Sequence, residues 1–309
     1  MPDGQGPARG QELDGAMIER RLFLISTAAF VGASGQAAPA SREGIDRRLG
    51  AIQDSLGRGA RLGVMAVDTG SGRQIAFNAN VRFAMCSTFK LPLAAFVLRL
   101  AERRLLSLAE QLTFRPRDLI ENSRIVEANL ERGGLPIEAL AAAAVCQSDN
   151  SAANLLLRRT GGPGALTDFV RACGDRVTRV DRYELALNSN VDGDPRDTTT
   201  PAAMAALVRK LLLGDILSAR SRARLTEWMV TSVRKPDRLK GGFPRGWRVG
   251  HKPGTGRGGA VNDVAIAWPP GKPPLIAAAY ISGGTGDSEA RAAAHRAIAD
   301  LIARRIGRS

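Results

Sequence analysis

Segments with strand character lie near both ends of this chain, and helical segments fill the middle. Residues 63–76 alternate apolar and polar side chains on either side of a Gly-rich turn at 69–72, which indicates a β-hairpin. Late in the chain, strand character returns in the three segments 247–252, 260–267 and 275–281. Between the two ends, apolar residues recur at helical spacing in the segments 91–100, 137–145, 152–159, 164–172 and 201–212.

This order of segments predicts an α/β fold made of two intertwined domains. An α/β domain is built from residues 41–80 and 230–309, and an all-α domain of residues 81–229 is inserted into it. A closing helix is expected at 289–306. A chain of 309 residues is long enough to bury a large core in such an arrangement.

The first 40 residues have the features of an export signal. Arg20 and Arg21 precede an apolar run, 22–33, and a small-residue stretch ends in an Ala-x-Ala pattern at 38–40. The apolar run is too short to span a bilayer permanently, and the adjacent arginines favour the twin-arginine route. We expect an exported protein, periplasmic or secreted, with no stable membrane association once the signal is removed. A tail with a chance apolar patch is the alternative.

The composition argues against a nucleic-acid partner and against a metal. The formal charge is +14 at pH 7, but the basic residues are scattered singly and aromatic residues make up only 5%. No basic helix or aromatic platform for a nucleic acid is therefore expected. The three cysteines (Cys86, Cys146 and Cys173) and the two histidines (His251 and His295) show no metal-ligand spacing. We expect a monomer without metal or cofactor.

Three short motifs follow one another along the chain. They are Ser87-Thr88-Phe89-Lys90, Ser148-Asp149-Asn150 and Lys252-Pro253-Gly254. Ser87 and Lys90 are three residues apart, so on a helix they share one face. Near the N-terminus of that helix, exposed N–H groups and the helix dipole favour negative charge forming at the serine. Because a serine hydroxyl is a weak nucleophile, it needs a base close by.

Together with Glu184 and Asn188, these motifs match the set found in class A β-lactamases and penicillin-binding proteins. From about Ile45 to its C-terminus, the chain resembles a class A serine β-lactamase, a member of the penicillin-recognising serine hydrolases. The resemblance implies the β-lactamase/transpeptidase-like fold, an antiparallel five-stranded sheet flanked by helices. It places the active site between the sheet domain and the all-α domain.

The resemblance also implies an activity and a partner. The expected reaction is hydrolysis of the β-lactam amide of penicillins and cephalosporins through an acyl-enzyme on Ser87, which confers resistance; the partner is the small-molecule β-lactam. Two alternatives are a DD-peptidase and a β-lactam-binding sensor that stays acylated. Glu184 and Asn188 argue against both, because a deacylating water is what each of these would lack.

Glu184 and Asn188 are four residues apart in a turn-rich stretch. A single helical turn would bring their side chains together around one water. Glu184 then takes a proton from that water as it attacks the acyl-serine carbonyl. For acylation the base is either neutral Lys90 or Glu184 acting through a water, and both alternatives stay open.

Arg182 and Asp197 flank this stretch, and an ion pair between them would close the loop 182–197 at its neck. The segment resembles the Ω-loop of class A enzymes. For the second motif, the resemblance implies that Ser148 relays a proton to the β-lactam nitrogen and that Asn150 bonds the substrate's side-chain amide. Asp149 is expected to tie down its loop from behind.

The third motif supplies the expected binding site for the substrate. Lys252 begins the strand edge that lines the site, and Thr255 is expected to provide a second oxyanion N–H beside that of Ser87. Arg238 matches the place where some class A enzymes keep an arginine that binds the substrate carboxylate. Val261 fits this interpretation, since it stands where other members carry their arginine.

Some positions depart from the family pattern. Pro253 replaces the usual Ser or Thr, which removes a hydroxyl that would bond the substrate carboxylate; proline is tolerated there if the strand lies at a sheet edge. His251 replaces a common Asp, and Asn122 stands where an aromatic residue often lines the site. In some relatives a Cys at the place of Cys86 forms a disulfide, but the partner position here is Gly256, so this disulfide is expected to be absent.

Overall fold

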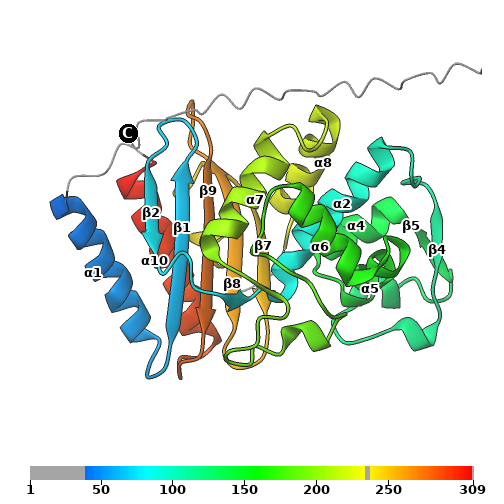
Figure 1. Cartoon of the computed structure of the whole chain (residues 1–309), viewed down its shortest axis with the longest axis horizontal. Coiled ribbons are helices and arrows are strands. Elements are labelled where there is room, and N and C mark those ends of the chain that lie inside the picture. Colours follow the sequence, from blue (N-terminus) through cyan, green and yellow to red (C-terminus); the bar gives the residue numbers. More distant parts are fainter. Residues whose placement is uncertain (1–38, 234–236, 308–309) are drawn as a thin grey trace, which may run out of the picture. The chain divides into compact units, whose positions relative to one another are not determined.

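The computed structural model describes residues 39–233 and 237–307 (Figure 1). The predicted export signal, 1–40, lies outside the described residues except for its last two positions, which begin helix α1 (Pro39–Ser55). Within the described ranges, no helix is both long enough and apolar enough to cross a membrane.

Five strands form one antiparallel sheet in the order β2-β1-β9-β8-β7. Their bounds are β1 Arg61–Asp68, β2 Gln74–Phe77, β7 Arg248–Thr255, β8 Val261–Trp268 and β9 Leu275–Ser282. The predicted hairpin and the three late strands are confirmed, and so is the five-stranded antiparallel sheet. Strand β7 lies at an edge of the sheet, as the proline at position 253 requires.

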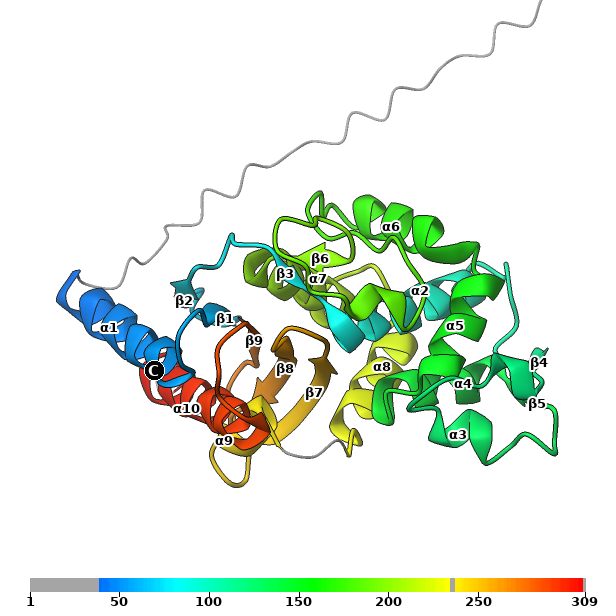
Figure 2. The same ribbon diagram turned by 90° about the horizontal axis from the view of Figure 1, so that it is seen from below.

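Both faces of the sheet are covered, because successive residues of a strand point to opposite faces. In β9, Ile276, Ala278 and Tyr280 join a core formed with the helices from the middle of the chain. Ala277 and Ala279 point the other way, into a second core with α1 and α10 (Ser288–Arg305). The helices α1 and α10 come from opposite ends of the chain and lie side by side (Figures 1 and 2).

The helical segments predicted from periodicity are confirmed, with small differences at their ends. The larger helices between the strands are α2 Lys90–Glu102, α4 Ile137–Cys146, α5 Asn150–Arg159, α6 Gly162–Ala172, α7 Pro201–Leu213 and α8 Ala219–Val230. The longer helices α1 and α8 were not among the predicted segments. Short elements that the sequence patterns did not reveal are α3 Arg124–Glu127, α9 Leu239–Gly242, and the pairs β3 (Phe83–Ala84) with β6 (Thr198–Thr199) and β4 (Gln111–Thr113) with β5 (Gly134–Pro136).

Candidate active site

Ser87 lies in a short 3-10 helix, Cys86–Phe89, that runs directly into α2. The α-helix itself begins at Lys90, so Ser87 precedes the helix by one 3-10 turn instead of lying within it. The turn packs against β7, because Gly254 has no side chain: a Cβ there would stand 2.9 Å from Met85 O and 3.1 Å from the backbone N of Ser87. This contact brings the serine to the end of the strand that carries Thr255.

Lys90 connects the first motif to the second and to the loop 182–197. Its Nζ donates to Ser148 O at 2.9 Å and to Asn150 Oδ1, and it pairs with Glu184 Oε1 at 2.9 Å. The side chains of Lys90 and Glu184 are both fully buried. A buried ion pair of this kind persists only when each charge is compensated and hydrogen-bonded, as both are here.

The side chain of Asp149 fixes the second motif through hydrogen bonds to the backbone. Its Oδ1 caps the start of α5 by accepting from Ala152 N at 2.8 Å, and its Oδ2 accepts from Ile125 N and Val126 N at 2.9 and 3.1 Å. Asn150 is therefore the first residue of α5, whereas the sequence had indicated a loop for this motif. Ser148, with a φ of 59°, turns its hydroxyl to the third motif.

Lys252 links the second motif to strand β7. Its Nζ donates to Ser148 Oγ at 2.9 Å, and its side chain is fully buried. Together, Lys90 and Lys252 contact Ser148 from two sides, one at its carbonyl oxygen and one at its hydroxyl. The three motifs, which are spread over more than 160 residues of the sequence, thus meet at one place.

The Ω-like loop brings Glu184 to the same place. Asn188 Nδ2 donates to Glu184 Oε2 at 2.6 Å across a single 3-10 turn, Ala186–Asn188, as the spacing of the two residues predicts. Asn154, which the sequence analysis missed, holds the backbone of Glu184: its Oδ1 accepts from Glu184 N and its Nδ2 donates to Glu184 O, both at 2.9 Å. The sequence did contain a signal for Asn154, because it is a polar residue four positions after Asn150 and therefore on the same face of α5.

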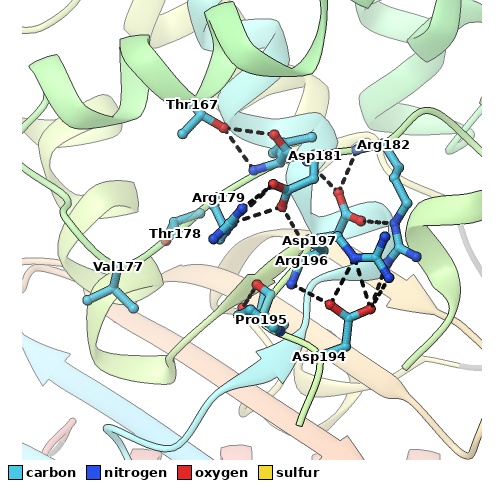
Figure 3. Close-up of polar contacts among 12 residues, drawn as sticks. Thr167, Val177, Thr178, Arg179, Asp181, Arg182, Asp194, Pro195, Arg196 and Asp197 are labelled. Carbon is cyan, nitrogen blue, oxygen red and sulfur yellow. Dashed lines mark hydrogen bonds and ion pairs between the residues drawn. The ribbon is translucent and has the colours of Figure 1, made fainter. Parts of the chain in front are cut away.

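The neck of the loop is closed by two aspartates that cap each other's backbone (Figure 3). Asp197 Oδ1 accepts from Asp181 N at 2.7 Å and from Arg182 N at 3.0 Å, while Asp181 Oδ2 accepts from Asp197 N at 2.9 Å. The predicted ion pair is present, with Arg182 Nε 2.5 Å from Asp197 Oδ2. Because the Asp197 side chain is only 1% exposed, this pair is a structural feature and not a surface salt bridge.

Replacing Asp197 with alanine should destabilise the protein by about 3 kcal/mol, because one buried partner is removed and two backbone N–H groups lose their acceptor. Denaturant unfolding followed by circular dichroism measures the change. Asp192 in the same loop is the matched control: its side chain is 90% exposed and pairs with Arg61 at 3.3 Å, so its alanine variant should unfold like the parent. Equal losses in the two variants would contradict the account of the neck.

Arg238 approaches the same end of β7 from outside the sheet. It lies just before α9 and is 8% exposed. Its Nη1 donates to Gly254 O and Asn262 O, and its Nη2 donates to Thr255 Oγ1, all at 2.7 Å. The guanidinium therefore reaches the strand edge beside Thr255, although its residue precedes that strand and lies outside the sheet.

The positions that depart from the family pattern also have definite surroundings. A Cβ built on Gly256 would stand 2.5 Å from Cys86 Sγ, so these two positions are neighbours, and the expected absence of a disulfide follows from the glycine. Burial raises the pKa of the Cys86 thiol to about 12, which leaves it protonated and unreactive. Asn122 has a φ of 61° and accepts from Asn150 N at 3.2 Å.

Comparisons with known proteins agree with this geometry. A family model described as the β-lactamase enzyme family matches residues 46–306. A β-lactamase of Streptomyces lavendulae is 41% identical over 272 residues, covering 85% of this chain and 88% of that protein. The β-lactamase CTX-M-8 of Citrobacter amalonaticus is 38% identical over 284 residues, covering 92% of this chain and 97% of that protein.

Solved structures give the same result. An ancestral class A β-lactamase is 45% identical with a TM-score of 0.82, covering 84% of this chain and 99% of its own. A β-lactamase from Xanthomonas campestris pv. campestris is 44% identical with a TM-score of 0.81, covering 84% of this chain and 97% of its own. The fold is thus that of the class A serine enzymes. The chain belongs to the β-lactamase enzyme family, which confirms the resemblance inferred from its motifs.

Proposed function

We propose that this protein hydrolyses the amide bond of β-lactams, penicillins and cephalosporins among them, through an acyl-enzyme on Ser87. The observation that carries the proposal is the convergence on Lys90, whose Nζ contacts Glu184, Asn150 and Ser148 within a fully buried arrangement. Such a cluster beside a serine is what an activated nucleophile requires.

In the acylation step, Ser87 Oγ attacks the lactam carbonyl carbon and its proton passes to a base. Lys90 can take it directly, or Glu184 can take it through a water, and the ion pair between these two lets a proton pass from one to the other. The N–H groups of Ser87 and Thr255 stabilise the oxyanion that forms. As the C–N bond breaks, Ser148 relays a proton to the lactam nitrogen: it gives up its own and takes one from Lys252, which donates to its hydroxyl.

In the deacylation step, Glu184 takes a proton from a water as the water oxygen attacks the acyl carbonyl. The ester bond to Ser87 then breaks, and Glu184 returns the proton to Ser87 Oγ. Asn188 supports this role in two ways. Its Nδ2 holds Glu184 Oε2, and its own Oδ1 is buried with no hydrogen-bond partner among the residues described. A small hydroxylic molecule between Glu184 and Asn188 would satisfy that oxygen.

The substrate carboxylate is expected to bind at the end of β7, on Lys252, Thr255 and Arg238. With proline at position 253, the motif lacks the hydroxyl that its relatives use there. Arginine offers a planar fork that meets both oxygens of a carboxylate, which suits it to compensate. The bond from Arg238 Nη2 to Thr255 Oγ1 supports this assignment, because it places the guanidinium at the required edge.

Replacing Arg238 with alanine should lower kcat/KM for both a penicillin and a cephalosporin by about ten- to one hundred-fold, the cost of losing a charge-assisted hydrogen bond. Steady-state kinetics measure the change. Arg245, an exposed arginine shortly before β7, is the matched control, and its alanine variant should behave like the parent. If the Arg238 variant stays within about two-fold of the parent on both substrates, the carboxylate is bound elsewhere.

Nitrocefin turnover by a protein of residues 41–309 tests the proposed function directly. Continuous hydrolysis is expected. A stoichiometric burst without turnover would favour the sensor alternative, and hydrolysis of D-alanyl-D-alanine peptides in place of β-lactams would favour a DD-peptidase.

We further propose that the protein is a monomer and that it is exported, the export on the strength of the charged, apolar and small-residue segments in positions 1–40. Fractionation of cells that express the full chain should find the processed protein outside the cytoplasm. Unprocessed protein in the cytoplasm would contradict this.

A further inference from the structure

We propose that His251 is a positioning residue for Arg238, acting through Asp263. This inference rests on the proposed function, in which Arg238 binds the substrate carboxylate. It concerns a buried polar group that the reaction steps above do not use. His251 and Asp263 lie on neighbouring strands, β7 and β8, and both are fully buried.

The contacts form a chain from the histidine to the arginine. His251 Nδ1 is 3.0 Å from Asp263 Oδ2, and the same oxygen accepts from Leu239 N, also at 3.0 Å. Leu239 is the first residue of α9, and Arg238 directly precedes it. Asp263 therefore ties the backbone that carries Arg238 to the sheet, and His251 holds the carboxylate that makes this tie.

The other end of the arginine is held by strands β7 and β8. Its guanidinium donates to Gly254 O, Asn262 O and Thr255 Oγ1. These contacts and the bond to Leu239 N fix Arg238 at both ends. A change at Asp263 therefore first shifts the backbone of Arg238. Its guanidinium group then approaches the edge of β7 at a different angle.

Electrostatics give Asp263 a second role. Burial alone would raise the pKa of its carboxyl, but His251, followed by smaller contributions from His295 and then Arg238, outweighs this, and the pKa lies below its ordinary value. The group is therefore a carboxylate at neutral pH and is a buried counter-charge for Arg238. Removing the partner of a buried carboxylate costs free energy, so His251 stabilises the negative charge of Asp263. That charge in turn stabilises the positive charge of Arg238.

The histidine acts here as a hydrogen-bond donor. Its Nε2 is buried and has no hydrogen-bond partner among the described residues. With a proton on Nδ1, the ring donates to Asp263 Oδ2. An asparagine amide can donate from nearly the same place, so His251→Asn should preserve the chain of contacts and His251→Leu should break it.

His295 provides a matched control. It is the other histidine of the sequence and is equally buried, on α10. Its Nε2 donates to Val261 O at 3.1 Å and makes no bond to Asp263. Burial lowers its pKa to about 4, so its ring is neutral at pH 7. Replacing it disturbs the same core without touching the chain of contacts to Arg238.

The test is a double-mutant cycle on benzylpenicillin, with kcat and KM measured separately. We expect His251→Leu to raise KM about three- to ten-fold with a smaller change in kcat, since the carboxylate is bound throughout the reaction. His251→Asn and His295→Leu should stay within about two-fold of the parent. In an Arg238→Ala background, His251→Leu should cause no further change. Circular dichroism below the melting temperature verifies that each variant is folded.

Three outcomes would overturn the inference. They are an equal rise in KM with and without Arg238, a failure of His251→Asn to rescue, or an equal effect of His295→Leu. If His251→Leu does not fold, Asp263→Asn gives the same test, because it keeps the size of the side chain and an acceptor for Leu239 N but loses the charge. A parent protein that fails to turn over benzylpenicillin would instead contradict the proposed function.

Discussion

Replacing Ser87 with alanine should abolish covalent capture of β-lactams and lower kcat by a factor on the order of 10⁶, as loss of the nucleophile does in other serine hydrolases. The remaining residues can bind substrate and polarise its carbonyl, but no oxygen is left to form the acyl bond. The fold should survive. Ser87 is 8% exposed, and its hydroxyl makes no hydrogen bond with the other described residues, so its removal leaves no other group without a partner.

Ser151 is the control for this variant. It is also buried, and its hydroxyl donates to Asp118 O at 2.7 Å and accepts from Ile120 N at 3.0 Å. Ser151→Ala should therefore lose stability and keep turnover, the reverse of Ser87→Ala. Nitrocefin kinetics and thermal unfolding on both variants measure the contrast. A Ser87→Ala protein that still forms a penicilloyl adduct would refute the assignment of the nucleophile.

Replacing Glu184 with glutamine should slow deacylation by about 10²–10⁴-fold, the usual cost of losing a general base, while the protein still acylates. Acylation survives because only deacylation must use this carboxylate: Lys90, still held by Ser148 O and Asn150 Oδ1, can serve as the base for acylation. The amide keeps the size of the side chain but cannot take a proton from the water. Single-turnover measurements with a chromogenic cephalosporin separate the two rates.

A shorter carboxylate tests the geometry of the same step. Glu184→Asp keeps the base but withdraws it by one methylene, away from Asn188, which now bonds it at 2.6 Å. Its deacylation rate should fall between those of the parent and the glutamine variant. If both variants deacylate as fast as the parent, another group activates the water.

Local patterns in the sequence were sufficient for the main elements of the fold. Alternation predicted the hairpin of β1 and β2, and helical spacing predicted α2, α4, α6 and α7 with end errors of one or two residues. The short elements were missed because they carry no periodicity of their own. Two-residue strands such as β3 exist only through pairing with a distant partner, here β6.

Within the site, the sequence predicted those contacts that join residues of the same motif or loop. Glu184 and Asn188 are in contact because they are four residues apart in sequence. The Arg182–Asp197 ion pair could be predicted because both residues flank the same turn-rich loop. Asn154 was missed because its partner is the backbone of a segment 30 positions away. The bond between His251 and Asp263 depends on the register of β7 with β8, which the sequence does not reveal.

In the proposed mechanism, Ser87 forms an acyl-enzyme, and a water activated by Glu184 then hydrolyses it. Intact mass spectrometry after mixing the parent protein and the Glu184→Gln variant with benzylpenicillin, followed by peptide mapping, tests it most directly. We expect an adduct of the mass of the whole substrate on the peptide that contains Ser87, transient in the parent and accumulating in the variant. An adduct on another residue, or a parent protein that stays acylated for hours, would contradict it.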